Sequence, residues 1–120
     1  MSHKILIIDD EVDVMKMVVY RLKAKNYEVF TATDGKSGIE LAKEIKPDLI
    51  ILDYHLPDMM ASEISKIIKS EESLKDVEII LVSASVEYLS DKAKECLAAA
   101  FIPKPIEPEE LYEKVEKYIK

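Results

Sequence analysis

The chain has 120 residues, nearly half of them apolar, which suits one domain with a single hydrophobic core. Its net charge of −7 excludes non-specific nucleic-acid binding, because no basic stripe can neutralise phosphates, and its single cysteine, Cys96, excludes an internal disulfide and fits a reducing compartment. No stretch approaches the ~20 apolar residues of a membrane span, and the first residues are too polar for a signal peptide, so we expect a cytoplasmic protein without membrane insertion.

Five short apolar runs, each bounded by turn residues, predict buried strands of a parallel sheet. In chain order they cover residues 5–8, 28–32, 49–52, 79–82 and 100–102. Between them apolar residues recur at spacings of three and four, which is typical of a helix that packs one face on a sheet. The residues expected to face inward are Val12, Met15, Val19 and Leu22; Ile39, Ala42 and Ile45; Ile64, Ile67 and Ile68; and Leu89, Ala93, Cys96 and Leu97. Pro108 lies near the first turn of a fifth helix.

Strands that alternate with helices predict an α/β fold with a doubly wound, five-stranded parallel sheet and five helices. In the flavodoxin-like order 2-1-3-4-5, the first and third strands are neighbours, and ligands bind at the carboxyl ends of the strands. Asp9 and Asp10 directly follow the first strand, and Asp53 follows the third. We therefore expect the three side chains to lie close together.

Three carboxylates at one place call for a cation. Two of them about 4 Å apart repel by roughly 4 kcal/mol at an effective dielectric near 20. Oxygen ligands and room for water and a phosphate favour Mg²⁺ (or Mn²⁺) over Ca²⁺. The alternative is that aspartates simply favour loops after strands, which accounts for one aspartate better than for three.

Two further polar residues end strands at the same expected edge. Lys104 follows the fifth strand and supplies a point charge suited to a phosphoryl oxygen; the alternative is a surface lysine in a weak ion pair. Ser83 closes the fourth strand, where its hydroxyl can reach the same oxygens or serve only as a turn residue.

Four segments carry a resemblance to a known family. They are Ile-Asp-Asp-Glu at 8–11, Leu-Asp-Tyr-His-Leu-Pro at 52–57, Val-Ser-Ala at 82–84 and Phe-Ile-Pro-Lys-Pro at 101–105. In this order and at these spacings they resemble the receiver domain of two-component response regulators, in the form of a single-domain, chemotaxis-type receiver. The resemblance covers residues 1–120 as one receiver domain.

The resemblance implies a phosphorylation-activated signalling switch rather than an enzyme. Asp53 would accept a phosphoryl group from a histidine kinase, a phosphotransfer protein or a small donor such as acetyl phosphate. Asp10, Asp53 and the backbone carbonyl of His55 would bind Mg²⁺ directly, with Asp9 assisting through water. The metal and nearby cations would offset charge on the transferred group.

The resemblance also implies how the signal is passed on. Lys104 and Ser83 would contact the phosphoryl group, and Phe101 would rotate inward, which changes the face formed by the fourth helix, the fifth strand and the fifth helix for a downstream effector. The alternative for Phe101 is a static core aromatic. The Lys104–Pro105 bond is often cis in such proteins, and we expect cis here.

Two residues depart from the family pattern, and two others occupy positions that vary the rate of dephosphorylation. Ala61 and Leu97 stand where family members usually or often have glycine, so we expect altered loop geometry at both places and an uncertain cap on the fourth helix. His55 and Ser85 lie two residues beyond Asp53 and Ser83, at positions that tune dephosphorylation in the family.

Other interpretations remain open or are rejected by particular residues. The chain is either a stand-alone switch or a receiver excised from a longer transcriptional or other regulator; Ala99, Ala100 and a last helix without arginine disfavour the dimer of such transcription factors. A degenerate receiver that only binds proteins is disfavoured by the complete set of acids. A flavin carrier and an aspartate phosphohydrolase are both rejected, because each would need residues other than Asp-Asp-Glu at positions 9–11.

Overall fold

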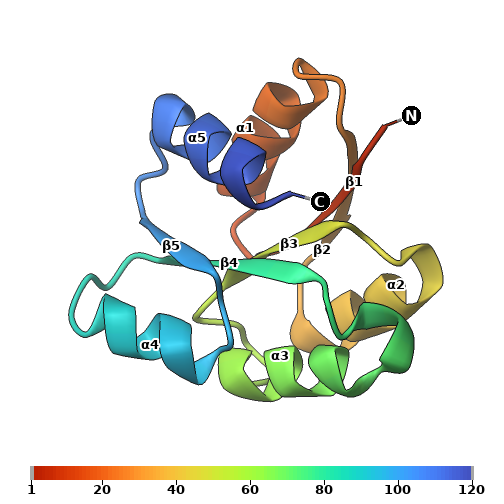
Figure 1. Cartoon of the computed structure of the whole chain (residues 1–120). Coiled ribbons are helices and arrows are strands. Elements are labelled where there is room, and N and C mark those ends of the chain that lie inside the picture. Colours follow the sequence, from red (N-terminus) through yellow and green to blue (C-terminus); the bar gives the residue numbers. More distant parts are fainter. Residues whose placement is uncertain (1, 120) are drawn as a thin grey trace.

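The computed structural model describes residues 2–119, and its centre is one five-stranded parallel sheet in the order β2-β1-β3-β4-β5 (Figure 1). The strands are β1 (Lys4–Ile8), β2 (Glu28–Ala32), β3 (Leu49–Asp53), β4 (Glu78–Ser83) and β5 (Ala100–Pro103). The predicted order and all five predicted strands are confirmed, each to within one residue at either end. No helix in the described part of the chain is long and apolar enough to span a membrane.

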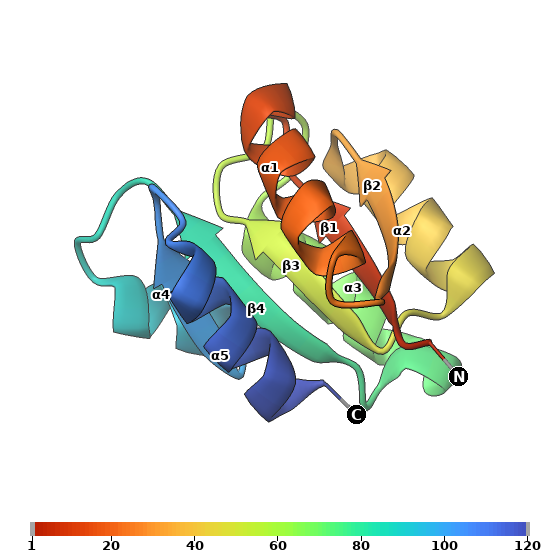
Figure 2. The same ribbon diagram turned by 90° about the horizontal axis from the view of Figure 1, so that it is seen from above.

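The helices cover both faces of the sheet. They are α1 (Val12–Lys23), α2 (Gly35–Ile45), α3 (Ala61–Ser70), α4 (Leu89–Glu95) and α5 (Pro108–Tyr118), with a short 3₁₀ turn, η1 (Glu72–Leu74). Figures 1 and 2 show α1 and α5 on one face and α2, α3 and α4 on the other. The architecture is therefore the predicted doubly wound α/β fold.

Two apolar cores result, one on each face of the sheet. Successive residues of a strand point to opposite faces, so Ile5 and Ile7 of β1 pack towards α1 and α5, whereas Leu6 and Ile8 pack towards α2 and α3. All four are almost completely buried. Burial on both faces explains why the central strands are continuous apolar runs rather than alternating ones.

The prediction that Ile67 of α3 faces inward is wrong. Ile67 is 38% exposed, whereas Ile64 and Ile68 are fully buried. The buried face of α3 also contains Ser62 and Ser65, so it is centred away from Ile67. The Ser65 hydroxyl donates to the Ser62 carbonyl at 3.1 Å, which lets a serine occupy the core without an unsatisfied hydrogen-bonding group.

The predicted inner face of α1 is shifted as well. Met15, Val18 and Leu22 are its buried residues, while Val12 is 51% exposed and Val19 is half-buried. Val12 is the first residue of α1, and it lies beside Val29 and Thr31 of β2 at the surface rather than in the core.

Leu97 follows Cys96, the C-cap of α4, and takes the left-handed conformation in spite of lacking the freedom of glycine. Its φ is 55°, and its N–H donates to the Lys94 carbonyl at 3.1 Å. The Ala98 N–H donates to the Ala93 carbonyl at 2.9 Å, which completes a Schellman motif. The expectation of altered geometry at this place is therefore wrong, as is the inward position of Leu97, which is 48% exposed. Ala61 is the first residue of α3 rather than a loop residue.

We expect Leu97→Gly to raise the free energy of unfolding by about 1 kcal/mol, because a left-handed backbone costs glycine no steric strain. Urea unfolding checks this. Leu97→Ala is the matched control, since alanine removes the exposed side chain but keeps the strained backbone. A gain with alanine equal to that with glycine would show that the side chain, not the backbone, is the source of the effect.

Candidate functional site

The carboxyl ends of β1 and β3 bring three acids together. The two strands are direct neighbours, with Ile8 opposite Leu52, so Asp9 and Asp53 extend adjacent strands at the same level. One carboxylate oxygen from each of Asp9, Asp10 and Asp53 lies within 4.8 Å of the others. Asp9 and Asp53 are each only 3% exposed, while Asp10 is open to solvent. The expected acidic cluster is present.

Lys104 places its ammonium in this cluster from the end of β5. Nζ lies 3.2 Å from an oxygen of Asp53 and 3.2 Å from an oxygen of Asp9, and the side chain is 8% exposed. The Lys104 backbone N–H donates to the Ser83 carbonyl at 2.9 Å, which fixes the end of β5 against β4. The peptide bond that follows, Lys104–Pro105, is cis, as predicted.

Burial and neighbouring charges shift the pKa values of Asp53 and Lys104. Burial and the Asp9 carboxylate raise the pKa of Asp53 to about 6, against the opposing effects of the Lys104 ammonium and the His55 N–H. That N–H donates to Asp53 Oδ1 at 3.2 Å. Burial would lower the pKa of Lys104, but the carboxylates of Glu11, Asp53 and Asp9 outweigh it and raise that pKa.

Glu11 belongs to the site although its role was not predicted. Its Oε1 lies 2.6 Å from Lys104 Nζ, and its backbone N–H donates to Asp9 Oδ1 at 2.8 Å. The signal that could have found it is its place immediately after the two aspartates and immediately before α1. A residue there lies at the same sheet edge as the strand ends.

The Ser83 hydroxyl does not contact the acids in this structure. Ser83 is fully buried at the end of β4, and its hydroxyl donates to the Ser85 carbonyl at 3.0 Å and accepts from the Ser85 N–H at 3.2 Å. Both partners belong to the loop that leads to α4. A hydroxyl that turned towards the cluster would therefore release this loop.

Phe101 and His55 lie at the rim rather than in the core. Phe101 is 36% exposed, so it is not a core residue in this structure, and its inward rotation stays a prediction. The His55 side chain is exposed, and its ring meets the Tyr54 ring edge-on, with centroids 5.0 Å apart. Lys92 of α4 places Nζ 4.8 Å from the centre of the same Tyr54 ring. These contacts link the loop after β3 to α4.

The comparisons with known proteins decide the family. The family model described as the response regulator receiver domain matches residues 5–116. The chain belongs to this family. It is 30% identical over 120 residues to the alkaline phosphatase synthesis transcriptional regulatory protein PhoP of Bacillus subtilis, a match that covers 100% of this chain and 50% of PhoP. The chain therefore spans half the length of that relative.

Two solved structures show the same receiver fold. The chemotaxis response regulator CheY4 of Vibrio cholerae has a TM-score of 0.92 at 27% identity, with 99% of this chain and 100% of that chain covered. The response regulator TrrA of Thermotoga maritima, solved in complex with Mg²⁺-BeF, has a TM-score of 0.86 at 31% identity, with 99% and 100% covered. Receiver domains are signalling switches rather than classical enzymes, and they act between histidine kinases and downstream effectors.

The donor atoms of this receiver fit the divalent cation of the family. Receiver domains bind Mg²⁺ in their acidic site. The three clustered aspartates here offer oxygen ligands only, which is the donor set that Mg²⁺ and Mn²⁺ take. Asp10 is exposed, so one side of the cluster is open to water and to a phosphoryl donor.

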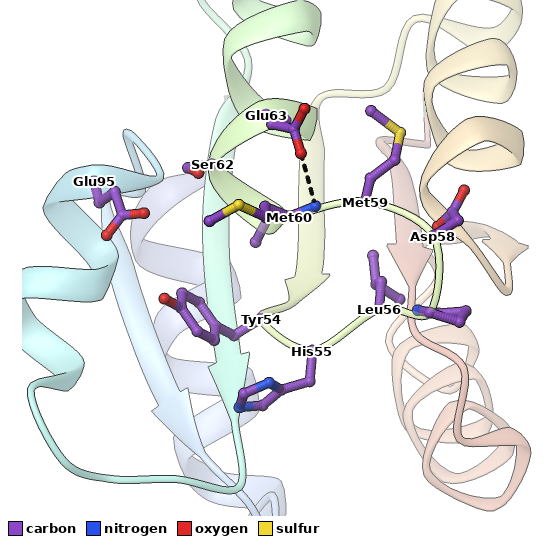
Figure 3. A pocket seen from close by; sticks show the side chains of 11 residues that line it. Tyr54, His55, Leu56, Asp58, Met59, Met60, Ser62, Glu63 and Glu95 are labelled. Atoms are coloured by element: carbon purple, nitrogen blue, oxygen red, sulfur yellow. Dashed lines mark hydrogen bonds between the residues drawn. The ribbon is translucent and has the colours of Figure 1, made fainter.

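The loop from β3 to α3 borders the site and is held at its far end. The Asp58 carboxylate accepts from the backbone N–H groups of Gly35 and Lys36, at 2.8 and 3.0 Å, at the start of α2. These bonds lower the pKa of Asp58. Figure 3 shows the loop passing from Tyr54 to Met60, with Asp58 on the side that faces α2. The loop lines a cavity of about 400 Å³. The sequence pattern alone does not predict this anchor.

Proposed function

We propose that this receiver is a phosphorylation-activated switch in which Asp53 accepts the phosphoryl group. The observation that carries the proposal is the convergence of Asp9, Asp10, Asp53 and Lys104 at one sheet edge. Asp53 occupies the centre of this group, because its two oxygens accept from Lys104 Nζ and from the His55 N–H. A buried carboxylate with a cation on one side and an open acidic rim on the other suits in-line attack on a phosphorus atom.

The proposed step is a nucleophilic transfer. An Asp53 carboxylate oxygen forms a bond to phosphorus while the bond to the donor breaks, and the leaving imidazole of a phosphohistidine, or the acetate of acetyl phosphate, keeps the electron pair. Lys104 donates N–H groups to the equatorial phosphoryl oxygens. Asp10, Asp53 and the His55 carbonyl would hold Mg²⁺ or Mn²⁺, with Asp9 assisting through water, and the bound cation supplies positive charge beside the same oxygens.

The proposed output begins at Ser83. A phosphoryl group on Asp53 offers new acceptor oxygens, and the Ser83 hydroxyl leaves Ser85 to donate to one of them. The loop before α4 then moves and opens room for the half-exposed Phe101 to turn inward. This changes the face of α4, β5 and α5, where an effector would bind. His55 and Ser85 border the phosphoryl group and would tune its hydrolysis.

The proposed partners are a histidine kinase or phosphotransfer protein and an effector protein, with no direct contact to nucleic acid. Residues 1–120 would act as one receiver unit. The half-length match to PhoP supports one alternative, a receiver that belongs to a longer transcriptional regulator. A degenerate receiver that only binds proteins is the other alternative, and the buried Lys104–Asp53 contact argues against it.

Intact mass spectrometry after incubation with acetyl phosphate and Mg²⁺ tests the proposal. We expect the protein to gain one phosphoryl group, because a small donor needs only the acidic site and not a kinase surface. Asp53→Asn should gain none, and a chelator should abolish the gain in the native protein. A phosphoryl group on the Asp53→Asn variant would move the acceptor elsewhere, and absence of both phosphorylation and beryllofluoride binding would favour the degenerate receiver.

A further inference from the structure

Three carboxylates share the Lys104 ammonium, and the shortest contact comes from Glu11. Nζ lies 2.6 Å from Glu11 Oε1, but 3.2 Å from the nearest oxygens of Asp9 and Asp53. A lysine ammonium has three N–H donors and no acceptor. Each donor therefore has a carboxylate partner in this state. A phosphoryl oxygen on Asp53 can accept an N–H from Lys104 only when one of these carboxylates loses its hydrogen bond to that ammonium.

Glu11 is the partner that can leave without disturbing the acidic cluster. Asp9 and Asp53 are buried, whereas the Glu11 side chain is 56% exposed and lies outside the group of three aspartates that could hold a cation. The Glu11 backbone stays tied through its N–H to Asp9 Oδ1. Its side chain makes no capping bond to α1, and among residues 2–119 the one ion pair it forms is that with Lys104.

We propose that Glu11 is a positioning residue that holds Lys104 in the unphosphorylated state and competes with the phosphoryl group for its ammonium. This inference rests on the proposed role of Asp53 as acceptor. The Glu11 carboxylate and the phosphoryl oxygens carry charge of the same sign and need the same N–H donors. Formation of the Lys104–phosphoryl contact therefore breaks the Glu11–Lys104 ion pair, and the strength of that pair opposes activation.

The affinity for beryllofluoride, a phosphoryl mimic, tests this competition at saturating Mg²⁺. We expect Glu11→Gln to bind about two- to fivefold more tightly than the native protein, the range that an exposed ion pair gives. Asp13→Asn is the matched control: it removes the same charge from the first turn of α1, and Asp13 is not among the carboxylates on Lys104. Its affinity should equal that of the native protein.

A second readout is salt. Because Glu11 is exposed, the gain in Glu11→Gln should shrink towards none as the ionic strength rises. An unchanged or weaker affinity in Glu11→Gln would overturn the proposal, and so would an equal gain in Asp13→Asn, which would mark a general charge effect. If the native protein itself failed to bind beryllofluoride with Mg²⁺, the proposed function of Asp53 would fail too. Binding by the native protein without a gain in the variant would remove only the role of Glu11.

Discussion

Replacing Lys104 by methionine should lower the free energy of unfolding by about 3 kcal/mol at pH 7.5 in the absence of divalent cations. The Lys104 ammonium is the cation that Asp9, Asp53 and Glu11 share in the metal-free protein, and its side chain is only 8% exposed. Without it, two buried carboxylates face each other with no compensating charge. Urea unfolding of both proteins in a chelating buffer measures the loss.

Added Mg²⁺ should return most of this loss, because a ligand that binds only the folded state stabilises it by mass action and replaces the missing charge. Lys75→Met is the matched control, since Lys75 forms an exposed ion pair with Glu72 and its loss should change stability by less than about 1 kcal/mol. Equal losses in the two variants, or a loss that Mg²⁺ leaves unchanged, would mean that Lys104 does not neutralise the cluster.

The fold could be predicted because its determinants are local and periodic. Residues 49–52 form a continuous apolar run, and the structure buries this run on both faces of the sheet. An aspartate directly after such a strand has to lie at the carboxyl edge, so Asp9 and Asp53 were placed by chain order alone. The same reasoning brought Lys104 to that edge from β5.

The parts that were missed depend on side-chain choices among several partners. The spacing of Glu11 allows a contact with Lys104, but nothing in the sequence says that this carboxylate makes the shortest one. Asp58 lies in the loop before α3, yet its carboxylate bonds to the start of the neighbouring helix α2, more than twenty residues earlier in the chain. The Ser83 hydroxyl had the acids and its own loop within reach, and only the structure shows that it bonds to Ser85.

Backbone conformation was the other feature that could not be predicted from the sequence. The absence of glycine at Leu97 suggested a changed loop, because a left-handed residue without glycine costs about 1 kcal/mol or more. The structure keeps the left-handed turn at Leu97, and the Ala98 N–H still reaches the Ala93 carbonyl. Hydrogen bonds that satisfy the last carbonyls of α4 outweigh the local strain, a balance that residue preferences alone do not give.

Replacing Asp53 by asparagine should make the metal-free protein more stable at pH 7.5, by about 2 kcal/mol, even though it removes the proposed acceptor. Burial and Asp9 raise the pKa of Asp53 to about 6 in the folded protein, above the ordinary 3.8. The folded state then binds more protons than the unfolded state between these two values. The contribution of Asp53 to stability therefore falls as the pH rises from about 4 to about 6, and stays low above that.

Asparagine cannot ionise, so the stability gap between Asp53→Asn and the native protein should open across this pH range and nearly vanish at pH 4. Thermal or urea unfolding at several pH values in chelating buffer measures it, with Asp76→Asn as control for the loss of one exposed charge before β4. A stability difference that does not change with pH, or an equal difference in Asp76→Asn, would show that the effect does not come from the raised pKa of Asp53 in the acidic cluster. With Mg²⁺ the difference in the free energy of unfolding should narrow or change sign, because the cation stabilises the native carboxylate. The repulsion among the three acids, which destabilises the metal-free protein, is therefore what a bound cation relieves.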